Sequence, residues 1–143
     1  MEVRPDWHDY FLGIAEAVAK RGECTRSRVG AVLVKDRRIR STGYNGAPQG
    51  APSCLLGACP RATSNAIPGV SSYDDPATAC IAIHAEANAL LFASKDDCQD
   101  ATLYITRAPC SGCERLILGA GILRVITPEG EFSRGNGVLY KAI

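Results

Sequence analysis

Apolar residues recur at helical spacing near the start of the chain. Trp7, Phe11, Ile14 and Val18 follow one another at alternating intervals of four and three residues, which puts them on one face of a helix. Asp6 stands directly before them, where its carboxylate can accept hydrogen bonds from free backbone N–H groups. The pattern therefore predicts an amphipathic helix that begins after Asp6 and packs on a sheet.

Two short apolar stretches then predict a β-hairpin. Residues 29–34 and 39–43 are rich in β-branched and apolar side chains, and the residues between them are polar. From 43 to 79 this order is lost, because Gly and Pro are frequent and no helical or strand period is sustained. We expect one long irregular loop there, and such loops in compact domains are usually functional or disordered.

Helical and strand patterns alternate in the second half of the chain. Residues 84–93 have the periodicity of a helix. The apolar face expected for it consists of Ala87, Leu90 and Leu91. A second helix is expected over 109–120, opened by a capping box of Ser111 and Glu114 and ended by Gly121. Further strands are expected at residues 102–106, 122–127 and 138–143.

Strands separated by helices are typical of an α/β layer structure. The helix at 109–120 is expected to connect two parallel strands, 102–106 and 122–127, as a crossover. With 143 residues, the chain 1–143 is expected to be a single domain with a buried core. Ligands in such folds bind at strand ends, where the motifs described next are found.

Charge and composition narrow the choice of partner. Sixteen Lys and Arg against fifteen Asp and Glu give a net charge of +1, which favours a small substrate over nucleic acid or an anionic membrane. The first ten residues lack the pattern of a secretion signal, and no later stretch is long and apolar enough to span a membrane. We therefore expect a cytoplasmic protein, in which seven cysteines favour metal or thiol chemistry over disulfides.

Two motifs at the expected helix starts offer ligands for a metal ion. Cys110 and Cys113 lie three residues apart on a first helical turn, where they share one face and the helix N-terminus favours zinc-binding thiolates. His84 supplies a third ligand if the two helices are neighbours. Three protein ligands leave a fourth position for water, as in catalytic zinc sites, whereas structural zinc usually has four protein ligands.

Glu86 favours the catalytic interpretation. Zinc lowers the pKa of bound water from about 15.7 to about 7, and deamination also needs protons at the ring and at the leaving amine. Glu86 stands two residues after His84, so it can move those protons without binding the metal. A lone C-x-x-C is equally typical of a redox pair or of half a structural zinc site. Together, however, the motifs match the zinc deaminase signature H-x-E…P-C-x-x-C.

The chain resembles the cytidine deaminase superfamily and, within it, the deoxycytidylate deaminase family. The resemblance covers residues 22–128 and is carried by VGAVLVKDRRI, STGYNGAPQG, IHAEANAL and TLYITRAPCSGCERLILGAGI. The zinc motifs are shared with deaminases of tRNA adenosine, guanine and riboflavin precursors, whereas GYNG-x-P is more discriminating. The resemblance implies a cytidine-deaminase-like three-layer α/β fold, with a central mixed sheet of about five strands flanked by helices.

The resemblance also implies which residues bind the substrate. Asn45 of the GYNG motif is expected to hydrogen-bond the substrate sugar, although an asparagine before Gly46 is also typical of a simple turn. The base pocket is expected to be lined by the backbone at Val29, Ala31 and Ala85. A phosphate needs cationic or backbone donors, for which the nearest candidates are Arg26, Arg28 and Arg107.

A second set of cysteines lies in and around the long loop. Some related bacterial and phage deaminases carry a further, structural zinc at similar places, and four cysteines satisfy a tetrahedral site. The alternative is that some of them are free thiols. The candidate ligands are Cys24, Cys54, Cys59 and Cys80.

The expected reaction is hydrolysis of deoxycytidine monophosphate (dCMP) to deoxyuridine monophosphate (dUMP) and ammonia. Zinc-bound hydroxide attacks C4 of the ring, while Glu86 protonates N3 and then the departing amine. The alternatives are the same chemistry on a nucleoside, a triphosphate, a modified cytosine nucleotide or a purine base, and a non-catalytic zinc module. The resemblance also implies a homo-oligomer.

Overall fold

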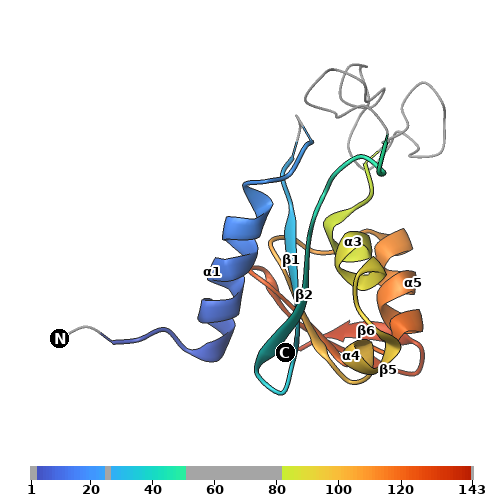
Figure 1. Ribbon diagram of the computed structural model, residues 1–143. Coiled ribbons are helices and arrows are strands. Elements are labelled where there is room, and N and C mark those ends of the chain that lie inside the picture. The colour runs from blue at the N-terminus through green and yellow to red at the C-terminus, as the bar shows by residue number, and fades with distance from the viewer. Residues whose placement is uncertain (1–2, 25–26, 51–81, 143) are drawn as a thin grey trace.

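The computed structural model describes residues 3–24, 27–50 and 82–142, which form one sheet with helices on both faces (Figure 1). The strands are β1 (Gly30–Lys35), β2 (Arg38–Tyr44), β3 (Thr102–Ile105), β4 (Arg124–Thr127), β5 (Gly130–Gly135) and β6 (Val138–Lys141). The helices are α1 (Trp7–Ala19), α3 (Ala85–Leu91), α4 (Lys95–Cys98) and α5 (Ser111–Ala120). The strands lie in the order β2-β1-β3-β4-β5-β6.

The helices form a layer on each side of this mixed sheet. α1 packs against one face, and α3 and α5 lie together on the other (Figure 1). β3 and β4 run parallel, whereas all other neighbouring strands of the sheet are antiparallel. Because α5 connects β3 to β4, the predicted crossover is confirmed, and so is the three-layer α/β fold. The described sheet has six strands where about five were expected.

The strand β1 is buried on both faces and separates two hydrophobic clusters. Ala31 and Leu33 belong to the cluster that includes residues of α3 and α5, whereas Val32 and Val34 belong to the cluster under α1. This alternation is the two-residue period of a strand that is covered on both sides. The apolar run predicted as the first strand of the hairpin is therefore the place where both helix layers attach.

The first helix begins as predicted. The Asp6 carboxylate accepts a hydrogen bond from the Asp9 backbone N–H at 2.8 Å and caps α1. Phe11 and Ala15 are buried against the sheet, whereas Trp7 is half exposed. Gly30 allows this close packing, because a Cβ at that position would overlap the Ala15 carbonyl oxygen.

The apolar face predicted for the helix after residue 84 is correct at Leu90, which packs against the core, but wrong at Leu91. Leu91 is 65% exposed, and the residues of α3 that are buried are Ala85, Glu86 and Ala89. The physical reason is a close approach of backbones: a Cβ on Gly43 of β2 would overlap Ala85 and Ala89. Small side chains therefore face β2 at this point, and Leu91 is left outside.

The predicted capping box of the last helix is also wrong. Ser111 is the first helical residue, and the N-cap is Cys110, whose Sγ accepts from the Cys113 backbone N–H at 3.5 Å. The predicted stop is confirmed, because Gly121 ends α5 in the left-handed conformation with φ 89°. The sulfur of Cys110 is thus held at the open end of the helix.

Two elements were not predicted. β5 pairs with both β4 and β6, although its sequence GEFSRG is rich in glycine and polar residues. Only Phe132 of this strand packs against the core. The other missed element, α4, is a single turn capped by Ser94 and Asp97. Both are too short or too polar to show a hydrophobic period.

Candidate active site

Three side chains from two separate motifs meet where α3 and α5 begin. His84 Nδ1 lies 3.3 Å from Cys113 Sγ and 3.5 Å from Cys110 Sγ. One possible ligand atom from each residue lies within 4.8 Å of the other two. The structure therefore brings together the three predicted zinc ligands.

The spacing of these atoms fits a zinc ion. Zinc binds sulfur at about 2.3 Å and imidazole nitrogen at about 2.0–2.1 Å, so tetrahedral ligands of these two kinds stand about 3.5 Å apart. The observed distances of 3.3 and 3.5 Å agree with that edge. Among the described residues, no fourth His, Cys, Asp or Glu joins the group. A three-ligand set of this kind leaves one coordination position for a solvent or substrate atom.

The two helices fix the cluster by their termini. His84 is the N-cap of α3 and Cys110 the N-cap of α5, both with extended backbone, and Cys113 lies in the first turn of α5. α3 and α5 pack against each other on one face of the sheet (Figure 1). The positive ends of two helix dipoles therefore point at the cluster, and this one contribution favours thiolates.

The protein around Cys113 disfavours a thiolate unless a cation is present. Burial raises the pKa of the Cys113 thiol, and the neighbouring Glu86 and Cys110 side chains raise it further. A divalent cation reverses this balance, because it stabilises coordinated thiolates directly. The cluster is thus a buried set of potential anions whose donor chemistry suits zinc.

Glu86 lies beside the cluster without being part of it. Its side chain is only 4% exposed, and it occupies the first turn of α3, one residue after the start of the helix. It is close enough to Cys113 to raise the pKa of that thiol. A buried carboxylate next to a metal position, but outside the ligand group, is suited to moving protons.

Asn45 holds the backbone before β1. Its side chain is 7% exposed, with Oδ1 accepting from the Val29 N–H at 2.9 Å and Nδ2 donating to the Ser27 carbonyl at 2.7 Å. The structure thus joins Asn45 to Val29 by a hydrogen bond, and the pocket expected around them stays a prediction. The other backbone positions expected in the pocket, Ala31 and Ala85, are fully buried in the same hydrophobic cluster as Val29.

Arg107 is a predicted phosphate contact that lies near these residues. Its Nη1 donates to Ser27 Oγ at 3.4 Å, which links the loop after β3 to the loop before β1. Cys24 accepts a hydrogen bond from the Ser27 N–H at 3.4 Å. Four predicted residues lie outside the described part of the chain: Arg26, Cys54, Cys59 and Cys80.

Sequence reasoning missed Asn88. Its Nδ2 donates to the Tyr44 carbonyl at 2.8 Å and to the Ile83 carbonyl at 3.3 Å. The available signal was a polar residue on the apolar helix, one turn after His84. Such a residue needs partners, and here they are two backbone carbonyl groups, those of Tyr44 and Ile83.

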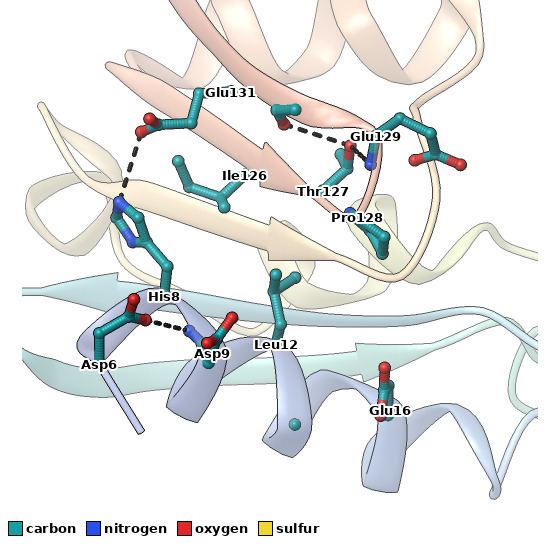
Figure 2. A pocket seen from close by; sticks show the side chains of 12 residues that line it. Asp6, His8, Asp9, Leu12, Glu16, Ile126, Thr127, Pro128, Glu129 and Glu131 are labelled. Atoms are coloured by element: carbon teal, nitrogen blue, oxygen red, sulfur yellow. Dashed lines mark hydrogen bonds and ion pairs between the residues drawn. The ribbon is translucent and has the colours of Figure 1, made fainter. Parts of the chain in front are cut away.

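A separate groove lies on the α1 side of the sheet. It has a volume of about 600 Å³ and is lined by α1 and by the turn between β4 and β5 (Figure 2). His8 crosses it to contact Glu131 at 3.4 Å. None of the predicted site residues lines this groove, which is separated from the cluster by the sheet.

Comparison with known proteins agrees with this geometry. The family model of the cytidine and deoxycytidylate deaminase zinc-binding region matches residues 5–128. The deoxycytidylate deaminase of Mycobacterium phage D29 is 60% identical over 126 residues, which are 88% of this chain and 97% of that protein. The deoxycytidylate deaminase of Schizosaccharomyces pombe is 42% identical over 86% of this chain, which spans only 37% of that protein.

The fold has a counterpart among solved structures. The crystal structure of dCMP deaminase from the cyanophage S-TIM5 in apo form matches with a TM-score of 0.63 and 26% identity. The match covers 87% of this chain and 84% of that one. The resemblance seen in the sequence motifs is confirmed, and the chain belongs to the zinc-binding cytidine and deoxycytidylate deaminase family.

Proposed function

We propose that this chain hydrolyses dCMP to dUMP and ammonia. The observation that carries the proposal is the buried carboxylate of Glu86 beside a three-ligand cluster that opens two helices. The relatives of 60% and 42% identity are both deoxycytidylate deaminases, which supports a nucleotide as the substrate.

Glu86 is the proposed proton carrier. When held by His84, Cys110 and Cys113, zinc would act as a Lewis acid that makes water nucleophilic at neutral pH. The Glu86 carboxylate takes one proton from the water that attacks C4 of cytosine and delivers it to N3. It then carries the second proton to the amino group as the C4–N bond breaks, so ammonia leaves and a carbonyl remains.

Asn45 and Arg107 are the proposed contacts to the rest of the nucleotide. An asparagine amide has two donor hydrogens and an acceptor oxygen with two lone pairs. Its two bonds to Ser27 and Val29 thus leave capacity for a sugar hydroxyl. Arg107 lies near the same backbone, and its guanidinium suits a phosphate, as does that of Arg26.

A non-catalytic zinc module is the competing hypothesis, and the ligand set within residues 3–24, 27–50 and 82–142 disfavours it. Structural zinc takes four protein ligands. Cys98, a nearby cysteine in the chain, is 3% exposed within the hydrophobic core and does not join the cluster. A buried carboxylate beside three ligands also has no evident structural use.

Ammonia release from a panel of substrates tests the proposal. The purified protein is incubated with dCMP, deoxycytidine, dCTP, cytidine monophosphate and guanine. We expect dCMP to have the highest kcat/KM. A higher value for deoxycytidine would refute the nucleotide assignment. Zinc-loaded protein that releases ammonia from no substrate would favour the module.

We further propose that the chain is one domain that forms a homo-oligomer in the cytoplasm. One sheet includes all described strands, which supports the single domain. Leu91, Phe92 and Leu116 are 65%, 80% and 54% exposed on α3, its C-cap and α5, which supports association between copies. The four described cysteines are free thiols, as in a reducing compartment. Within the described residues, no helix has the length and apolarity needed to cross a bilayer.

Two measurements test these assignments. Light scattering on the eluting protein gives its mass, and a particle of one chain, 15.2 kDa, would refute the oligomer. Metal analysis addresses the second zinc that we propose for Cys24, Cys54, Cys59 and Cys80. We expect about two zinc ions per chain, falling to about one in Cys54→Ser.

A further inference from the structure

Asn88 joins the two halves of the proposed active site through one amide group. Its Nδ2 donates to the Tyr44 carbonyl at 2.8 Å and to the Ile83 carbonyl at 3.3 Å. The next residue after Tyr44 is Asn45, and the next after Ile83 is His84. One side chain therefore holds both the peptide group before Asn45, the proposed nucleotide contact, and the peptide group before His84, the proposed metal ligand.

The same two segments are also paired directly. Gly46 and Ile83 exchange backbone hydrogen bonds of 3.1 and 2.7 Å in an isolated antiparallel bridge. A single bridge pairs only one residue of each segment, so it does not fix the angle at which the two segments cross. A longer ladder of paired residues would fix that angle. The Asn88 amide adds a third point, since it contacts both segments from α3.

Asn88 is itself held firmly in relation to His84. Its backbone N–H donates to the His84 carbonyl at 2.9 Å, in the first turn of α3. The side chain extends from that turn back to Tyr44, across to the end of β2. A shift of α3 would thus be transmitted to both carbonyls.

A second polar link between the same elements provides a comparison. Ser41 Oγ donates to the Ala89 carbonyl at 2.7 Å, and Ser41 is buried. This bond also connects β2 with α3. Its ends lie away from His84 and Asn45 in the sequence, so it stabilises the packing without holding the peptides next to them.

We propose that Asn88 is a positioning residue that fixes the metal ligand His84 relative to the substrate-binding Asn45. The part of this inference that concerns Asn45 and the nucleotide rests on the proposed function. The part that concerns His84 and the metal rests on the ligand cluster alone. A carboxylate or a methyl group cannot replace the two N–H donors, because the partners are both carbonyl oxygens. Loss of the amide should therefore loosen both sides together.

The test compares Asn88→Asp and Asn88→Ala with Ser41→Ala in the full-length, zinc-loaded protein. Three quantities are measured: the rate of zinc loss to a chelator, KM and kcat for dCMP, and the melting temperature. For both Asn88 variants we expect about tenfold faster zinc loss and a KM raised about tenfold. Ser41→Ala should lower the melting temperature about as much as the Asn88 substitutions do. Its rate of zinc loss and its KM should remain those of the wild type.

The outcomes separate a positioning role from a structural one. Asn88 variants that are less stable but keep wild-type zinc loss and KM would overturn the proposal, as would equal effects from Ser41→Ala. If Asn88→Asp does not fold, Asn88→Gln keeps the amide one methylene further out and should give an intermediate change in both quantities. A wild-type protein that deaminates nothing refutes the proposed function. The rate of zinc loss from the Asn88 variants still tests whether Asn88 positions His84.

Discussion

His84 Nδ1 and Cys113 Sγ lie 3.3 Å apart, although 29 positions separate the two residues. Neither motif binds zinc as a closed site by itself. The contact arises because β3 and β4 are parallel and α5 crosses between them, which sets the start of α5 beside the start of α3. Metal binding is therefore coupled to the packing of these two helices, and each should stabilise the other.

Removal of one sulfur should release the metal. In Cys113→Ser we expect loss of about one zinc ion per chain, the one at the His84 cluster, during dialysis against a chelator, because a hydroxyl is a much weaker zinc ligand than a thiolate. Metal analysis by mass spectrometry measures the content. Cys98→Ala is the matched control: that cysteine is buried in the core away from the cluster, and its loss should leave zinc content unchanged. Equal loss in both variants would contradict the assignment.

Replacement by alanine should have opposite effects at two glycines, one packed closely against α3 and one in open space on α1. Gly43→Ala puts a methyl group into the backbone of α3, so we expect a loss of about 1–3 kcal/mol in the free energy of unfolding. Gly13→Ala, in the middle of α1, meets no atom within 4 Å and should gain about 0.5–1 kcal/mol. Urea unfolding measures both. A neutral Gly43→Ala would show that α3 does not approach β2 this closely.

Tyr104 should give the protein an alkaline stability limit. Burial raises the pKa of its phenol above the ordinary value of 10.0. As the pH rises past 10, the unfolded chain ionises Tyr104 while the folded chain resists, so the free energy of unfolding falls. Tyr104→Phe lacks this dependence but also loses the hydrogen bond to His8, which costs about 1 kcal/mol at neutral pH.

The free energies of unfolding of the wild type and of Tyr104→Phe should therefore converge at high pH. Urea unfolding at several pH values between 8 and roughly 11 follows the difference between wild type and Tyr104→Phe. We expect a difference that is constant up to the ordinary tyrosine pKa and shrinks above it. A difference that grows with pH would mean that the folded protein favours the ionised phenol.

The sequence predicted the elements whose residues have a local reason to be where they are. Asp6, Gly121 and the alternating apolar residues of β1 follow from capping, left-handed backbone and strand period. The ligand residues were predictable for a chemical reason, since His, Glu and paired Cys at helix starts have few other uses in that combination.

What the sequence did not predict depends on contacts between distant segments. Leu91 was expected inside, but the small residues of α3 face Gly43, and only tertiary packing decides that. Asn88 was missed because its partners are backbone carbonyl groups, and one of them belongs to Tyr44 of β2, far away in the sequence. The cap of α5 was assigned to Ser111 because the motif for a capping box is local, whereas Cys110 takes that position in the fold.

The most direct test of the central claim is the turnover of dCMP by Glu86→Gln that still holds zinc. Conversion to dUMP is followed by absorbance, and zinc content is measured on the same sample. We expect wild-type zinc content with kcat reduced by about 100-fold or more, because the amide keeps the shape of the side chain but cannot carry protons. Full turnover in zinc-loaded Glu86→Gln would contradict the role of Glu86 as the proton carrier.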